Sequence, residues 1–442
     1  MTDYHLSQRA AYNSVHGDVW GPREQSMGNP WSPSNPTGTV NLRLAENSLM
    51  HEDIAESIKS QINVLPLQHL TYSTGPRGSR RLRGAAAQFL NQAFHACKPI
   101  TANDIFVTPG LASGIDVLAW CTCNDGDGIL IPQPLYNGFQ VDILNWSNVH
   151  VVPVSYTSVD GYSSLDDLFR PDVNRKALEA AIERAQDSRI TVRALLISKL
   201  PPETIEEFVL FCAAHRLHFI SDEIYAHSVF ENPALPNATP FVSILSLNLV
   251  NSNTIDPTMI HVLYGASKDF CANGLRLGLV CTRNQGIIRA MSSIDMFSWS
   301  PHLLQDVWAG MLEDGQWMKS FMARKRELMA DHYAVAARFF CKCEIPFYEM
   351  NAGLFFWINL RHLLFPSLKS TSAGAGEEPP SLSITSADSD EHQRREQRIC
   401  NICMEHGVLI APRHALEEGL RRLKDSLLRV QAETGAGLEP QH

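Results

Sequence analysis

The segment YGASKDFCANGLRLG, residues 264–278, is the most informative part of this 442-residue sequence. Within it, Lys268 follows a run of small residues, and Arg276 comes eight positions later, near two glycines. The lysine can offer its amine to an aldehyde. Ser267 and Arg276 can bind a phosphate, because arginine makes charge-assisted and often bidentate contacts with phosphate oxygens. A lysine after a serine is weak evidence by itself, so its meaning depends on the surrounding sequence.

A second motif, SDEIYAHSVF at residues 221–230, begins where an apolar segment ends. A carboxylate at this point, Asp222, can keep a pyridine nitrogen protonated, and Tyr225 can reach a phenolic oxygen. Read alone, this motif is equally compatible with a capped turn after a strand. Together, the two motifs provide the groups that pyridoxal phosphate (PLP) needs, which are an amine, a partner for the ring nitrogen and a phosphate-binding set.

Around both motifs, short apolar segments alternate with helical ones from about residue 104. Continuous runs of Val, Ile and Leu are typical of strands buried on both faces. Their alternation with helices predicts an α/β fold, a mainly parallel sheet with helices on both sides and right-handed crossovers. The predicted strands are 104–109, 128–134, 150–156, 193–198, 217–224, 259–265 and 277–283. The predicted helices between them are 111–122, 137–146, 173–187 and 203–215.

The remaining sequence suggests a domain division. Residues 1–40 are rich in Gly, Pro, Asn and Ser and predict an irregular N-terminal arm. We expect a large PLP-binding domain over 41–300, with part of the small domain near 41–60, and a small C-terminal domain over 301–435. Residues 366–395 are poor in apolar side chains and predict a disordered insertion in the small domain. Further expected elements are helices within 285–343, near 393–406 and over 415–431, and strands near 347–360 and over 408–412.

These motifs, in this order, resemble the fold-type I PLP-dependent enzymes of the class I/II aminotransferase superfamily. The resemblance is strongest to the 1-aminocyclopropane-1-carboxylate (ACC) synthase-like branch and extends to fungal enzymes of secondary metabolism. It covers about residues 40–360. It implies a PLP-transferase fold with a seven-stranded, mainly parallel sheet and a smaller α+β domain. It also implies PLP as cofactor, an amino acid as substrate and a homodimer.

The resemblance assigns roles to further residues. In RLAENSL, residues 43–49, Glu46 and Asn47 match substrate contacts. Tyr72 matches a tyrosine that reaches the phosphate bound by the partner subunit, and Tyr136 matches the aromatic residue that stacks on the pyridine ring. In PGLASGID, residues 109–116, a helix begins whose free N–H groups suit an anion. The phosphate-binding residues implied at that point are Leu111, Ala112 and Ser113.

Three departures from the family pattern stand out. The NPxNPxG-like loop expected after RALLIS is absent, and Lys199 follows that segment directly. The arginine that clamps the substrate carboxylate is also absent from GVLIAPRHALEEGLRRL, where Arg413 is not assigned its role. Gly265 stands where a phosphate-binding serine is common. The first two departures are compatible with real loss or with an error in the gene model.

The loss of the arginine has a measurable consequence. A hydrogen bond to a charged partner is worth roughly 1.5–3 kcal/mol, and removing one partner of a buried charge pair costs roughly 2–5 kcal/mol. Because a tenfold change corresponds to about 1.4 kcal/mol, substrate handling would weaken roughly tenfold to several thousandfold. We therefore expect cofactor binding to survive better than catalysis.

Several functions remain open at this point. The leading hypothesis is transamination of an amino acid, in which Lys268 forms the Schiff base and then moves the α-proton. The alternatives are a C–S or α,β-eliminating lyase, an ACC synthase-like enzyme, and a catalytically impaired relative that binds PLP or only a partner. A dinucleotide-dependent dehydrogenase is disfavoured, because no GxGxxG follows the first strand of the sheet.

Composition narrows the partners and the compartment. The net charge is −10, without the basic footprint that nucleic-acid binding leaves. No signal peptide is recognised near Met1, and no run of 18 or more apolar residues predicts a membrane span, so a cytoplasmic location is expected. The ten cysteines are expected to be reduced thiols. Cys400 and Cys403 form a CxxC without a second ligand pair nearby, so no metal site is predicted.

Overall fold

The structure, a computed structural model, divides into two compact units. The first, here called the sheet unit, comprises Met50–Val229 and Ala238–Lys325. The second, here called the terminal unit, comprises Met1–Leu49, Phe230–Asn237 and Arg326–His442. The structure describes residues 10–11, 14, 28–41, 46–62, 66–72, 74–136, 138–198, 200–248, 254–358, 394, 398, 402–403 and 408–409.

The sheet unit contains a seven-stranded sheet in the order β2-β8-β7-β6-β5-β3-β4. Its strands are β2 (Ile105–Thr108), β3 (Gly128–Pro132), β4 (His150–Val154), β5 (Val192–Ile197), β6 (His218–Asp222), β7 (Ile260–Gly265) and β8 (Gly278–Thr282). Each agrees with a segment predicted from apolar patterning to within one residue at its start. The mainly parallel sheet is confirmed, but β8 runs antiparallel to both β2 and β7. The chain therefore passes from β7 to β8 without the crossover that parallel neighbours require, which corrects that expectation.

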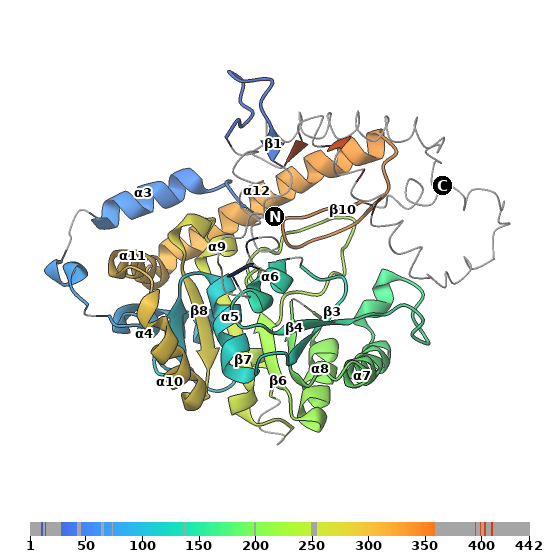
Figure 1. The fold of residues 1–442 in the computed structure, drawn as a ribbon. Helices are drawn as coiled ribbons and strands as arrows, with labels where there is room; N and C mark the ends of the chain where they lie inside the picture. Colours follow the sequence, from blue (N-terminus) through green and yellow to red (C-terminus); the bar gives the residue numbers. More distant parts are fainter. Residues whose placement is uncertain are drawn as a thin grey trace. The chain divides into compact units, whose positions relative to one another are not determined.

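Helices cover both faces of this sheet (Figure 1). One face packs against α5 (Leu111–Thr122), α6 (Gly138–Leu144) and α10 (Gln285–Ile294) through a core that includes Leu118, Ile143 and Met291. The alternate strand side chains lie on the other face, where α4 (Arg80–Ala93), α7 (Pro171–Asp187) and α8 (Pro202–His215) contact the strands. Because side chains alternate across a strand, continuous apolar runs supply both layers.

The remaining elements of the sheet unit are mostly short. They are α3 (His51–Ile62), α9 (Ala266–Asp269), α11 (His302–Glu313) and the 3-10 helices η1 (Leu67–Leu70), η2 (Leu165–Phe169), η3 (Ile244–Ser246), η4 (Pro257–Met259), η5 (Asn273–Leu275) and η6 (Asp295–Phe297). Fully buried side chains such as Phe106, Phe219 and Trp308 anchor the unit. Burying one such side chain contributes about 1.5–3 kcal/mol.

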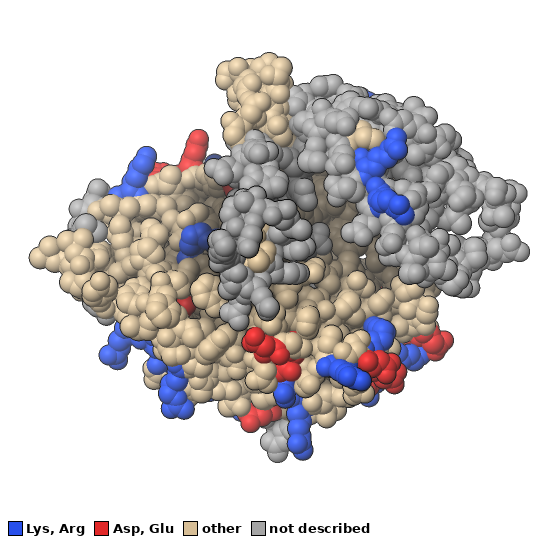
Figure 2. Space-filling model, in the orientation of Figure 1, with Lys and Arg blue, Asp and Glu red and all other residues tan. Residues whose placement is uncertain are grey.

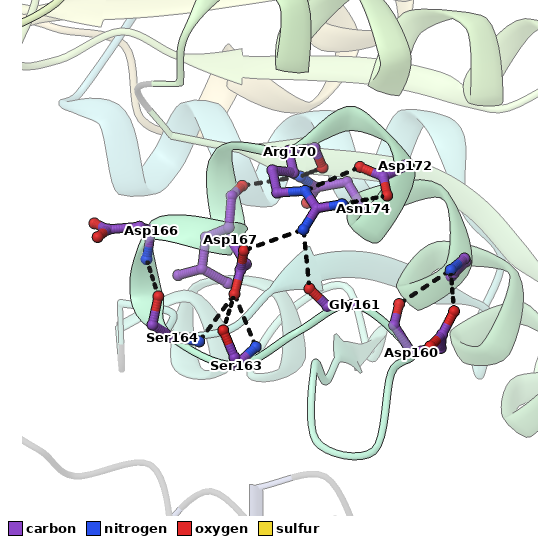
Figure 3. A network of polar contacts seen from close by, with 11 residues as sticks. Asp160, Gly161, Ser163, Ser164, Asp166, Asp167, Arg170, Asp172 and Asn174 are labelled. Carbon is purple, nitrogen blue, oxygen red and sulfur yellow. Dashed lines mark hydrogen bonds and ion pairs between the residues drawn. The ribbon is translucent and has the colours of Figure 1, made fainter. Parts of the chain in front are cut away.

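A polar network fixes the corner between β4 and α7 (Figure 3). The Asp167 carboxylate accepts hydrogen bonds from the backbone N–H groups of Ser163 and Ser164, at 2.8 and 3.0 Å. These bonds lower the pKa of Asp167 to about 2. Arg170 bridges Asp167 and Asp172, at 3.4 and 2.8 Å. The network lies where the 3-10 helix η2 ends and α7 begins, so α7 starts at a defined position against the sheet.

In the terminal unit, described residues form two small sheets beside the C-terminal part of a long helix. The helix α12 (Gly315–Lys342) begins in the sheet unit and continues into the terminal unit. Strands β9 (Phe347–Tyr348) and β10 (Trp357–Ile358) pair antiparallel, while β1 (Val40–Asn41) pairs parallel with β11 (Val408–Leu409). The predicted insertion 366–395, except for position 394, and the predicted helix 415–431 lie outside the described residues.

The part of the predicted arm that the structure describes, residues 28–40, consists mostly of turns and isolated bridges held by hydrogen bonds. The Asn35 side chain donates to the Asn29 side chain and to the Pro30 carbonyl, both at 2.8 Å. Backbone bonds from Trp31 to Thr39 and from Thr39 to Asn29 close the loop. Side-chain amides that bond to nearby backbone stabilise such turns.

Charge on the visible face is mixed. Figure 2 shows Lys and Arg interspersed with Asp and Glu over the described residues of that face, without one dominant basic area. Among the helices of the described residues, none is both long enough and apolar enough to cross a membrane.

Candidate active site

Lys268 lies at the end of a central strand. Strand β7 ends at Gly265, and Lys268 follows on the one-turn helix α9. Its side chain is half-buried, whereas Ser267 and Asp269 on either side are buried. Gly265 is required by close packing, since a Cβ atom there would lie 2.9 Å from the Leu277 carbonyl oxygen. The departure from the family's serine at this position therefore allows β7 and β8 to approach closely.

Asp222 lies at the corresponding end of the neighbouring strand β6, opposite Leu263 of β7. It is 7% exposed, and its Oδ1 accepts a hydrogen bond from the Ile224 N–H at 3.1 Å. Burial raises the pKa of Asp222 to about 6, while the Ile224 N–H and the charge of Lys268 oppose that rise. The two predicted side chains thus interact at one edge of one sheet, as the carboxyl ends of parallel strands allow.

Two tyrosines accompany this pair. Tyr225 follows β6, and its pKa is raised by burial first and then by the charge of Asp222 and by Tyr136. Tyr136 follows β3, is 54% exposed and makes an edge contact with Phe139, with ring centroids 5.4 Å apart. The electrostatic coupling between Tyr136, Tyr225 and Asp222 shows that these side chains share one neighbourhood.

The start of helix α5 and the Arg276 guanidinium lie close together, and this arrangement is here called the α5 cradle. Gly110 precedes α5 with φ 87° and ψ 172°, and no side chain caps this helix. The Arg276 guanidinium approaches Gly110 so closely that a Cβ atom there would collide with it, and its Nη2 lies 3.5 Å from the Pro109 carbonyl oxygen. The first N–H groups of a helix have no partner within the helix and favour anions. Leu111, Ala112 and Ser113 supply those N–H groups, so the cradle fits a phosphate.

We expect Gly110→Ala to weaken PLP binding about 10- to 100-fold, because it disturbs a charged contact worth roughly 1.5–3 kcal/mol. The backbone conformation at Gly110 is also nearly restricted to glycine. The measurement is a PLP titration followed by absorbance. Gly75→Ala is the matched control, since Gly75 has φ 59° and nothing within 4 Å of the added Cβ. Equal affinities for the two variants would contradict the cradle.

Three further residues were predicted to contact the substrate or the cofactor phosphate, namely Glu46, Asn47 and Tyr72. Glu46 is exposed and Asn47 is buried, and both belong to the terminal unit. The Asn47 Oδ1 accepts from the Leu49 N–H at 3.1 Å, while its Nδ2 is buried without a partner among the described residues. Tyr72 is 89% exposed and contacts Trp299 edge-on at 6.0 Å. The roles given to these three residues stay predictions.

Asp142, an acidic side chain on α6, was not predicted from the sequence as part of the site. Burial and the charge of Asp116 raise the pKa of Asp142 to about 6, and Arg276 opposes that rise. Asp142 in turn raises the pKa of Asp222. The only signal in the sequence was a single carboxylate on a short, mostly apolar helix, and that pattern more often indicates an exposed residue.

The connection that lacks the expected asparagine is short. Strand β5 ends at Ile197 and α8 begins at Pro202. Loops of about 2–6 residues are common between a strand and a helix, so the fold tolerates this connection. Both Lys199 and Arg413 lie outside the described residues.

A group of potential metal ligands occurs within the described residues at His69, His302 and Asp306. The His69 Nε2 lies 2.8 Å from Asp306 Oδ2, which is a hydrogen-bond distance. The Arg81 guanidinium lies 3.8 Å from the same carboxylate oxygen. A direct bond and a nearby cation favour a structural charge cluster over a metal site.

Comparisons with known proteins identify the family and the fold of this chain. The family model described as "Aminotransferase class I and II" matches residues 39–432. A mouse protein named "Probable inactive 1-aminocyclopropane-1-carboxylate synthase-like protein 2" is 32% identical over 82% of this chain, which spans 62% of the length of that protein. An Aspergillus oryzae protein named "Probable aminotransferase aclI" is 30% identical over 72% of this chain and 74% of its own length. The structure of Thermus thermophilus aspartate aminotransferase with maleate shares the fold at 18% identity, with a TM-score of 0.65 over 96% of this chain and 99% of that chain.

Proposed function

This chain belongs to the aminotransferase class I and II family, and on that premise we propose that it is a PLP-dependent enzyme that transfers the amino group of an amino acid. The observation that carries the proposal is the pair Lys268 and Asp222, whose charges interact at the carboxyl ends of adjacent strands. The pair matches the amine and the ring-nitrogen partner that PLP needs.

The side chains of the sheet unit fit PLP in distinct ways. The N–H groups of α5, together with Arg276 and Ser267, would hold the phosphate. Asp222 would bind the ring nitrogen, Tyr225 the phenolic oxygen, and Tyr136 the face of the ring. Lys268 would attach to the aldehyde. When bound, PLP supplies an electron sink that stabilises negative charge at the substrate α-carbon.

The residues themselves then have two tasks in catalysis. Lys268 would act as the base that moves the proton at the substrate α-carbon, and such general base catalysis typically contributes 10²–10⁴-fold. Asp222 holds a proton on the ring nitrogen. Burial raises the pKa of Asp222 to about 6, but this value is still below neutral pH. Asp222 is therefore an anion at pH 7, which is the form that can perform this role.

The experiment that tests this function is the incubation of the PLP-loaded chain with each common amino acid and a ketoacid acceptor. Mass spectrometry then identifies the products. A ketoacid formed from the donor supports transamination. A cyclised or eliminated product would instead support the ACC synthase-like or lyase reading. Cofactor binding without any product from the amino acids or from other candidate donors would support a non-catalytic relative.

One observation favours the second candidate, a relative that binds PLP but turns over poorly. The connection between β5 and α8 is too short to hold an NPxNPxG-like loop, so it lacks the asparagine that would contact the phenolic oxygen of PLP. A similar protein carries the word "inactive" in its name. This candidate predicts normal PLP affinity. It also predicts a turnover reduced roughly tenfold to several thousandfold, the effect expected from loss of the substrate-carboxylate arginine.

A homodimer is part of the proposal. Several large apolar side chains near Tyr72 are exposed, which is unusual for a surface that faces only water. They are Leu67 (81%), Leu70 (74%), Tyr72 (89%), Met296 (55%) and Phe297 (88%). Tyr72 would then reach the phosphate bound by the partner copy, as the resemblance implies.

We expect the double variant Leu67→Glu and Leu70→Glu to sediment as a monomer, because two charges placed in an apolar interface would be desolvated without partners. Sedimentation velocity at micromolar concentration measures the change against the unmodified chain. Trp146→Glu is the control, since Trp146 is also exposed, at 69%, but belongs to the segment after α6. A wild-type chain that sediments as a monomer would overturn the proposed dimer.

A further inference from the structure

A buried ion pair lies directly beside Lys268. Asp269 and Lys325 are both 0% exposed, and the Lys325 Nζ lies 3.1 Å from Asp269 Oδ1. The same ammonium donates to the Asp269 backbone carbonyl at 2.9 Å. Asp269 is the last residue of α9 and Lys325 is on α12, so the pair ties the turn that carries Lys268 to a long helix.

The Asp269 carboxylate also binds the segment that carries Tyr225. The Ser228 hydroxyl donates to Oδ1 at 2.7 Å, and the His227 backbone N–H donates to Oδ2 at 2.8 Å. The Tyr264 hydroxyl, from β7, donates to Oδ2 at 3.1 Å. One carboxylate therefore joins α9, the turn after β6, the strand β7 and the helix α12.

The chemistry of these contacts requires an anion at this position. Every group that faces the two carboxylate oxygens is a donor, namely an ammonium, two hydroxyls and one backbone N–H. An aspartate accepts all of them, whereas an asparagine would direct an NH₂ group at one set of donors. Desolvation makes such a pair costly to break but does not make it strongly stabilising as a whole. The pair therefore points to a role beyond stability, through the two segments that it holds in place, which are α9 and the turn after β6.

We propose that Asp269, held by Lys325, is a positioning residue that sets where the Lys268 amine and the Tyr225 hydroxyl lie relative to each other. The inference rests on the proposed function, because Lys268 and Tyr225 are the cofactor contacts named there. Asp269 is the chain neighbour of Lys268, and the backbone that it anchors, at His227 and Ser228, begins two residues after Tyr225. A shift of either segment by about 1 Å is enough to lower a rate about 100-fold.

The test compares Asp269→Asn, Lys325→Met and the double variant, all in the full chain. The double variant removes both charges, so it is expected to recover much of the thermal stability that each single variant loses. Positioning predicts that kcat stays about 10- to 100-fold below the unmodified value in all three, with a smaller change in KM. It also predicts a shifted pH midpoint of the visible absorbance of the PLP-loaded chain. The control pair Arg175→Met and Glu207→Gln removes a two-bond ion pair between α7 and α8 and should leave kcat and the pH midpoint unchanged.

A cofactor-free readout keeps this test separate from the proposed function. In the chain without PLP, acetylation of each lysine by an amine-reactive reagent is followed by mass spectrometry. Asp269→Asn and the double variant are expected to change the labelling rate of Lys268 but not that of exposed Lys176. The positioning role would be overturned by a stable double variant in which the Lys268 labelling rate, the pH midpoint and kcat all equal the wild-type values. A wild-type chain that does not bind PLP would overturn the proposed function, and the Lys268 labelling rate would still decide the positioning role.

Discussion

Lys268→Ala is expected to remove the visible absorbance of the PLP-loaded chain and to lower turnover by at least about 10²–10⁴-fold. Lys268 is the half-buried amine at the end of β7, and its charge interacts with Asp222. Its loss removes both the covalent attachment of the cofactor and the base that moves the α-proton, and the second effect alone accounts for this magnitude. The measurements are an absorbance spectrum after gel filtration with PLP, and the initial rate with the best amino-acid donor.

Two controls make this expectation specific. Lys268→Arg keeps the charge but should fail equally, because a guanidinium does not replace an amine toward an aldehyde. Lys176→Ala removes an exposed lysine that pairs with Asp160 on the surface and should change neither readout. If PLP-loaded Lys268→Ala has the same visible spectrum as the wild type, Lys268 is not the residue that attaches to PLP, and the proposed function is wrong.

Asp222→Asn is expected to make the cofactor-free chain more stable at pH 8 and far less active with PLP. The pKa of Asp222 is raised to about 6 in the folded chain, against about 3.9 in an unfolded one. This difference of about two pKa units corresponds to about 3 kcal/mol. The free energy of unfolding falls by that amount when the buried carboxylate ionises. Asparagine keeps the acceptor for the Ile224 N–H without the charge. Perturbed groups of this kind concentrate at functional sites, where stability is exchanged for chemistry.

The sign of the pH dependence follows from linkage. Because the folded pKa is above the unfolded one, the contribution of Asp222 to stability is fully present below about pH 4 and is lost as the pH rises through about 6. The stability advantage of Asp222→Asn should therefore vanish at pH 4 and be complete at pH 8. Urea unfolding of both cofactor-free chains at the two pH values measures it. A variant that is less stable at pH 8 would contradict the raised pKa.

The effect on activity has the opposite direction. Without the carboxylate, the ring nitrogen loses its charged partner, at a cost of roughly 2–5 kcal/mol. At about 1.4 kcal/mol per factor of ten, turnover should fall roughly 30- to several thousandfold. Glu223 provides the control, because its buried carboxylate has a pKa raised to about 7 but is bound by Ser221 and Ser243 within the core. Glu223→Gln should affect stability without this loss of turnover in the molecules that fold.

PLP binding and catalysis depend on different residues of this site. The α5 cradle and Arg276 serve the phosphate, whereas Lys268 and Asp222 serve the reacting part of the ring. A protein that has lost its substrate arginine can keep the first set intact. Measuring PLP affinity and turnover on the same variants therefore distinguishes an active aminotransferase from a relative that only binds the cofactor.

The local sequence determined much of this protein. Short apolar runs predicted all seven strands of the sheet, because strands that are buried on both faces are apolar at most positions. The same runs placed Asp222 and Lys268 at strand ends, and the topology of a mainly parallel sheet then predicted that they meet. The motif at residues 221–230 suggested the role of Tyr225, and the resemblance implied the roles of Tyr136 and the start of α5.

Only the tertiary structure decided the rest. It showed that β8 is antiparallel, that Arg276 packs on Gly110 and that Asp142 acts on Asp222. It also showed that Lys325, 56 residues after Asp269, supplies the buried counter-charge beside Lys268. None of these partners could be read from periodicity, because a local pattern reports whether a side chain is buried and not which distant residue it meets.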